Sequence, residues 1–131
     1  MGAVRDRVLA PANKSLLPYV TVFWDGSQNG ITTVTEYADM LGNAIAALGH
    51  DHFVVIPAGV PAGVTDLGQT TAIQLEFKRR WPNNFLDWRD ILPTKNGSIA
   101  ADLQCDPVHL NDKGLAAMAK GIATFVEAKG W

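Results

Sequence analysis

Cysteine is almost absent from this sequence, and so is any cluster of metal-binding side chains. The single cysteine, Cys105, excludes a disulfide within the chain. Cysteines and histidines do not recur at the spacing of a zinc site. His50 and His52 stand in an H-D-H sequence before an apolar run, where we expect a surface turn. We therefore expect no metal ion and no other cofactor.

An excess of charge of either sign is also missing. The chain has 11 lysines and arginines against 13 aspartates and glutamates, and the net charge is −2. Such a balance provides no basic surface for nucleic acid or for an anionic membrane. No apolar run approaches the roughly 20 residues of a membrane span, and the N-terminus lacks the apolar core of a signal peptide. We expect neither segment, and the cellular compartment stays open.

What the sequence does contain is an alternation of strand-like and helix-like segments within a single expected domain, residues 1–131. Hydrophobic residues make up 47% of the chain, which is ordinary for a globular domain with a real core. β-Branched and aromatic residues predict strands at 19–24, 52–57 and 84–88. Helical periodicity predicts helices at 36–48, 69–81 and 112–128.

Local signals support these boundaries. The first helix is preceded by the capping-box pattern Thr33-x-x-Glu36, and Gly49 is a plausible stop after it. Residues 60–68 and 93–104 are expected to be loops, the second with a turn at Asn96-Gly97.

The order of the segments predicts an α/β fold. Strands that alternate with helices at this spacing form βαβ units, and we expect a three-layer α/β/α, flavodoxin-like domain with a mainly parallel sheet. Three strands make a small parallel sheet, whose faces and edges both have to be covered. The first 18 residues offer one amphipathic stretch around Val4 and Val8 but no obvious strand. A strand is therefore missing, or another chain supplies it.

Two polar clusters follow the predicted strands, beyond the carboxyl ends where open α/β sheets bind ligands. One is Asp25–Gly30 and the other holds Asp106 and His109. An aspartate three residues before a histidine can orient the imidazole and stabilise its charged form. Asn29, in the opposite loop, carries a side-chain amide that is able to point at a developing oxyanion. The alternative is that Asp106 is a helix-capping residue and His109 a solvated side chain.

The same segments resemble a known family. DPVHLNDKGLAAMAKGI, from Asp106, is similar to the last conserved block of the SGNH (GDSL-type) hydrolases, D-x-x-H-L followed by a polar turn, a glycine and a helix. VTVFWDGSQNG, from Val20, resembles the strand of that superfamily that ends in G-x-N-D. The order of the elements between them also fits, so the resemblance covers most of residues 19–131 and implies an incomplete SGNH-hydrolase-like fold.

Carried over to this chain, the resemblance assigns roles to individual residues. His109 would be the general base, Asp106 the residue that orients it, and Asn29 an oxyanion donor. Gly2 would be the family's second oxyanion glycine. The resemblance implies ester hydrolysis, of carboxylic esters or of acetyl esters on carbohydrate, and no cofactor.

The sequence departs from the family in one respect that decides the chemistry: the first block, G-D-S, is absent. The chain has three serines, Ser15, Ser27 and Ser98. Ser15 precedes the first strand and Ser98 lies in an expected solvated turn. Ser27 follows a strand, but it would leave no G-x-N block and lies only two residues from Asn29. Cys105 precedes the acid that it would have to face, and we expect it to be a structural thiol. The nucleophile is thus not identified.

Three functions stay open. In the first, the chain is the Asp/His- and Asn-bearing part of a serine esterase whose nucleophile comes from another chain, so that the isolated chain is inactive. In the second, it is an inactive SGNH-like structural or binding module, for example in a phage virion or a surface assembly. In the third, it is a generic flavodoxin-like domain for a small ligand. The first two imply a protein partner, or self-association, at the open edge of strand 19–24.

Overall fold

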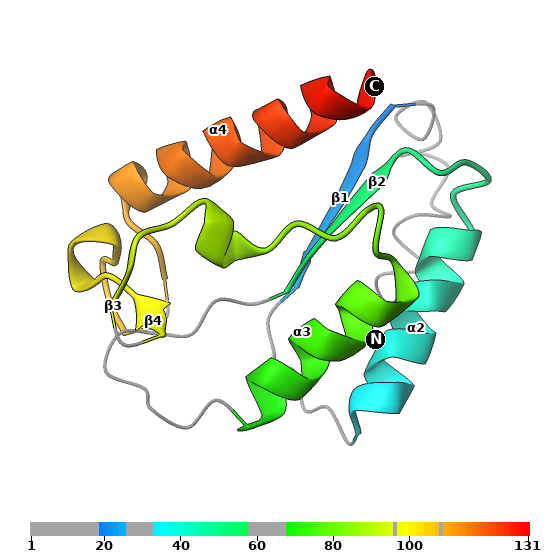
Figure 1. Cartoon of the computed structure of the whole chain (residues 1–131), viewed down its shortest axis with the longest axis horizontal. Helices are drawn as coiled ribbons and strands as arrows, with labels where there is room; N and C mark the ends of the chain where they lie inside the picture. The colour runs from blue at the N-terminus through cyan, green and yellow to red at the C-terminus, as the bar shows by residue number, and fades with distance from the viewer. Residues whose placement is uncertain (1–18, 26–32, 58–67, 96, 108) are drawn as a thin grey trace.

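The computed structural model describes residues 19–25, 33–57, 68–95, 97–107 and 109–131, and its architecture is a small α/β fold (Figure 1). The larger elements are two strands and three helices: β1 (Thr21–Asp25), α2 (Val34–Ala46), β2 (Phe53–Pro57), α3 (Gly68–Arg80) and α4 (Asp112–Lys129). None of the helices in these ranges is long and apolar enough to cross a membrane. The sequence predictions for all three helices are correct to within two residues at each end.

The sheet is parallel, as predicted, and smaller than predicted. β1 pairs with β2 in parallel, with Thr21 opposite Phe53. The predicted third strand, 84–88, is wrong: it is reduced to a single bridge between Val55 and Phe85. Asp87 ends the extended stretch because its side chain accepts a hydrogen bond from the backbone N–H of Arg89 and caps the 3-10 helix η2 (Trp88–Asp90).

The segment 93–104, expected to be a loop, also contains regular secondary structure. A short antiparallel hairpin joins β3 (Thr94–Lys95) to β4 (Ser98–Ile99), and the 3-10 helix η3 (Ala101–Leu103) follows. The turn between the two strands contains Gly97, with φ at 81°, a conformation that favours glycine. The turn lies where the sequence predicts it, but pairs of two residues are too short to leave a strand pattern in the sequence.

The core consists of two hydrophobic clusters, one on each face of the sheet. β2 contributes to both because its side chains alternate: Phe53 and Val55 belong to one cluster, Val54 and Ile56 to the other. The first cluster packs α2 and α3 against the sheet, with Tyr37 stacked on Phe77 at 5.5 Å between ring centroids. The second includes residues of η2, η3 and α4, among them Trp88, Leu103 and Met118.

β1 is buried on one face and only partly covered on the other, where Val20 packs against the second cluster. Phe23 packs into the first cluster and is 7% exposed. Val22 and Trp24 point to the opposite face and are 40% and 42% exposed. β-Propensity identifies a strand but does not tell whether its faces are covered. Leu75 of α3 and Leu115 of α4 are likewise exposed.

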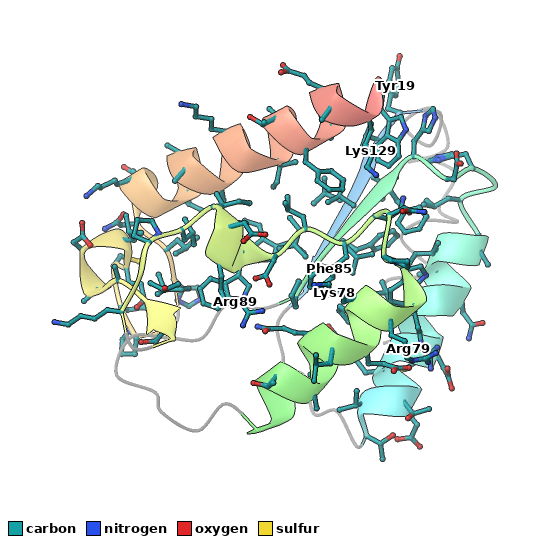
Figure 2. The ribbon with its side chains drawn as sticks, viewed as in Figure 1. Tyr19, Lys78, Arg79, Phe85, Arg89 and Lys129 are labelled. Carbon is teal, nitrogen blue, oxygen red and sulfur yellow. The ribbon has the colours of Figure 1, made fainter. Side chains whose placement is uncertain are left out.

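An ion-pair cluster ties α3 to α2. Glu76 accepts hydrogen bonds from Arg79 at 2.7 Å and from Arg80 at 2.6 Å, and Arg80 also reaches Asp39 of α2 at 2.6 Å (Figure 2 labels Arg79). The two guanidinium groups hold the pKa of Glu76 at about 2, well below its ordinary value. The charged form of Glu76 is therefore favoured in the folded chain.

This cluster predicts acid sensitivity. Because the pKa of Glu76 is lowered on folding to about 2, its contribution to stability is present above pH 4.5 and is lost as the pH falls toward 2. We expect Glu76→Gln to lower the melting temperature near neutral pH and to flatten its fall on acidification over this range. Thermal unfolding followed by circular dichroism measures both. Glu127→Gln on α4 is the control; an equal flattening in that variant would contradict the assignment.

Candidate active site

Asp106 and His109 form a hydrogen-bonded pair. The Asp106 carboxylate lies 2.7 Å from Nδ1 of the His109 ring through one oxygen and accepts the backbone N–H of His109, also at 2.7 Å, through the other. The same carboxylate thus fixes both the imidazole ring and the backbone of His109. A proton on Nδ1 leaves Nε2 with the lone pair that a general base needs. The predicted pairing of these two residues is present.

The pair is carried on a tight loop that closes on itself. Gln104 and Leu110 form an isolated antiparallel bridge, and the backbone N–H of Cys105 donates to the carbonyl of His109 at 3.0 Å. The thiol of Cys105 donates toward the carbonyls of His109 and Leu110, each at 3.6 Å. Cys105 therefore has a structural role, as predicted, although it is exposed rather than buried. Residue 108 lies outside the described part.

Asn111 attaches this loop to the start of α4. Its side-chain oxygen accepts from the backbone N–H of Gly114 at 3.0 Å and caps the helix. Its side-chain nitrogen donates to the carbonyl of Asp102 at 2.9 Å. Its own backbone N–H donates to Leu103 at 2.9 Å. One residue thus connects the loop that holds Asp106 and His109 to η3 and α4.

Gly114 allows η3 to approach the helix. A Cβ at this position would lie 2.5 Å from the carbonyl oxygen of Leu103, closer than side chains tolerate. An ion pair spans the same contact: Lys113 lies 2.5 Å from Asp102 and lowers the pKa of that carboxyl group. Asn111 and Gly114 have no predicted role, although an asparagine directly before the apolar periodicity of α4 is a helix-start signal.

The loop lies toward the end of the sheet where ligands of α/β folds bind. β1 and β2 run in the same direction, and their carboxyl ends point toward the side of the molecule that holds η3 and the start of α4 (Figure 1). Among the described residues, those that line a shallow depression beside the loop are Ala101, Gln104, Cys105, Asp106 and Pro107. The His109 side chain is 73% exposed and therefore open to a substrate or a partner.

The other predicted site residues are not brought to this loop by the described structure. Asn29, Ser27, Gly2 and Ser15 lie outside the described residues. Ser98, expected in a solvated turn, is instead 6% exposed, and its hydroxyl donates to the carbonyl of Lys95 at 2.9 Å. The side chain of Ser98 is therefore buried, and its hydroxyl is hydrogen-bonded within the β3–β4 hairpin.

The remaining histidines form the predicted surface turn. Nδ1 of His50 accepts the backbone N–H of His52 at 3.1 Å, and the His52 ring stacks on Trp131 at 5.2 Å between centroids. Across the residues that the structure describes, no group of three or more histidine, cysteine, aspartate or glutamate side chains is placed to hold a metal ion.

A comparison with models of known protein families finds no match to this chain, and a comparison with curated protein sequences finds none either. What can be said of function therefore depends on the geometry of the Asp106–His109 loop.

Proposed function

We propose that this chain is the Asp/His-bearing part of a serine ester hydrolase of the SGNH type. Its nucleophile would come from another polypeptide. The observation that carries the proposal is that the Asp106 carboxylate makes two hydrogen bonds to His109, one to Nδ1 of the ring and one to the backbone N–H. The backbone contact also closes the loop, whereas the contact at Nδ1 is the one that a general base needs.

The proposed roles follow from acid–base chemistry. His109 takes the proton of the attacking hydroxyl at Nε2 and returns it to the leaving alcohol. Asp106 keeps the proton of the neutral ring on Nδ1 and stabilises the imidazolium formed during the attack. The resemblance adds Asn29 and Gly2 as oxyanion donors and places the serine beside β1. On this proposal the domain is an incomplete version of a three-layer, flavodoxin-like SGNH fold.

One observation favours the second candidate function, an inactive structural or binding module. Ser98, the one serine among the described residues, is buried and bonded within its own hairpin, so it does not serve His109. A chain that had lost its serine would keep the Asp106–His109 contact only as a loop-closing device. The two functions differ in whether His109 reacts.

Hydrolysis of p-nitrophenyl acetate tests this difference, since imidazole attacks that ester without a serine. We expect slow turnover to acetate and p-nitrophenol, lowered about 10-fold in His109→Ala because the oriented base is lost. His52→Ala is the matched control, because His52 is also partly exposed but its neighbouring aspartate, Asp51, lies 3.8 Å from Nε2, the nitrogen that would have to attack. Equal rates in the two variants would favour the inactive module.

The nucleophile itself requires a second experiment. A partner that carries the serine should become reactive toward a fluorophosphonate only when His109 is present. We expect labelling of a co-purified partner at its serine with the natural chain and none with His109→Ala. Labelling that is the same with both chains would refute a composite active site.

A further inference from the structure

The outer edge of β1 has no partner among the residues that the structure describes. Thr21 donates its backbone N–H to the carbonyl of His52 at 3.0 Å, so Thr21 faces β2. Along a strand, the backbone N–H and C=O groups of successive residues point alternately to its two edges. The backbone groups of Val20, Val22 and Trp24 therefore point away from β2. These residues present N–H and C=O groups that a further strand can bind.

The side chains at this edge are also suited to pairing. Val22 and Trp24 are 40% and 42% exposed on the face of the sheet where Val20 packs against the second cluster. Tyr19, at 68% exposed, extends outward at the start of the strand (Figure 2). No charged residue and no proline lies in 19–24. Edge strands are normally protected by lysine, proline or a bulge. This edge has none of these protections.

We propose that β1 pairs antiparallel with the β1 strand of a second copy of the chain, about a two-fold axis at Val22. In this register Val22 lies opposite Val22 of the second copy, and Val20 lies opposite Trp24. All three outward-facing residues then form hydrogen-bonded pairs, each exchanging both N–H···O bonds. Any other antiparallel register leaves at least one of them opposite a residue beyond this set. The edge is therefore complementary to itself.

The side chains match in the same register. The pairs Val22–Val22 and Val20–Trp24 lie on one face, so both exposed side chains gain an apolar neighbour across the strands. Because residues 19–24 are uncharged, the two-fold axis brings no like charges together. Symmetric contacts of this kind close on themselves and give dimers rather than fibres.

The pairing does not depend on the proposed ester hydrolysis, since neither Asp106 nor His109 takes part. It would occupy the edge where a serine-bearing strand is proposed to add. The two interactions therefore exclude each other.

Sedimentation analysis of the full chain and its variants tests the dimer. We expect a mass twice the 14.1 kDa of one chain, and a monomer for Val22→Lys because two lysines would meet at the axis. Leu115→Lys, which replaces an exposed apolar residue on α4, is the matched control and should remain dimeric. Circular dichroism checks that each variant is folded. A monomeric natural chain, or a dimer that survives Val22→Lys, would overturn the proposal.

Cross-linking tests the register without a destabilising charge. In a Cys105→Ser background, Val22→Cys should form a disulfide-linked dimer, because Cα atoms of a hydrogen-bonded antiparallel pair lie about 5.5 Å apart. Trp24→Cys should not, since its counterpart lies four residues away along the strand, about 13 Å. Equal cross-linking of both variants would contradict this register. Slow amide exchange at Val22 in a monomer would show that another part of the chain covers the edge, which also overturns the proposal.

Discussion

Replacing Asp106 by asparagine is expected to remove most of the His109-dependent hydrolysis of p-nitrophenyl acetate, so that the total rate falls about 10-fold, to that of His109→Ala. The asparagine amide can donate to Nδ1, which moves the proton of the neutral ring to Nε2, where it blocks the attacking lone pair. The side-chain oxygen of asparagine can still accept the backbone N–H of His109. The loop should therefore keep its conformation while it loses its base.

Asp106→Ala separates the chemical role of the carboxylate from its structural role. The alanine variant loses both contacts to His109, so the rate and the order of the loop should fall together. Rates are measured with initial velocities, and loop order with amide exchange at residues 105–110. A rate for Asp106→Asn equal to that of the natural chain would mean that Asp106 only closes the loop.

The largest expected loss of stability is that of Gly114→Ala. Its Cβ would lie 2.5 Å from the Leu103 carbonyl, and a backbone atom cannot move aside as a flexible side chain can. We expect a loss of about 3 kcal/mol, the upper part of the usual range for overpacking, and a melting temperature lower by roughly 10 °C. Because η3 would be pushed from α4, the Asn111 contacts should weaken as well.

Gly42→Ala is the matched control for this substitution. Its Cβ would lie 3.7 Å from the Trp81 ring, which is an ordinary contact, within the helix α2. Alanine is a better helix former than glycine, so we expect a gain of about 0.5–1 kcal/mol. Denaturant unfolding of both variants measures the difference. Equal losses in the two would show that the approach of η3 to α4 is not the cause.

The helices could be predicted from sequence because each carries its own local signals. Thr33 accepts the backbone N–H of Glu36 at 3.1 Å, as the capping box predicts. α4 follows the periodicity that includes Met118 and Phe125. The Asp106–His109 pair was predictable for the same reason: both residues belong to one short loop, so no distant contact was needed to bring them together.

The sheet could not be predicted as fully. Whether residues 84–88 form a strand depends on Val55 of β2, a contact far away in sequence. The exposure of Val22 and Trp24 depends on where α4 packs, and strand propensity carries no information on that. The role of Gly114 depends on the position of the Leu103 carbonyl, which only the folded chain defines.

The most direct test of the account is the position of the proton on His109. Nitrogen-15 NMR of histidine-labelled protein, at alkaline pH where the rings are neutral, distinguishes the protonated ring nitrogen from the bare one. We predict a proton on Nδ1 and a bare Nε2 in His109, and the reverse in His109 of the Asp106→Asn variant. A proton on Nε2 in the natural chain would contradict the claim that Asp106 prepares His109 as a base.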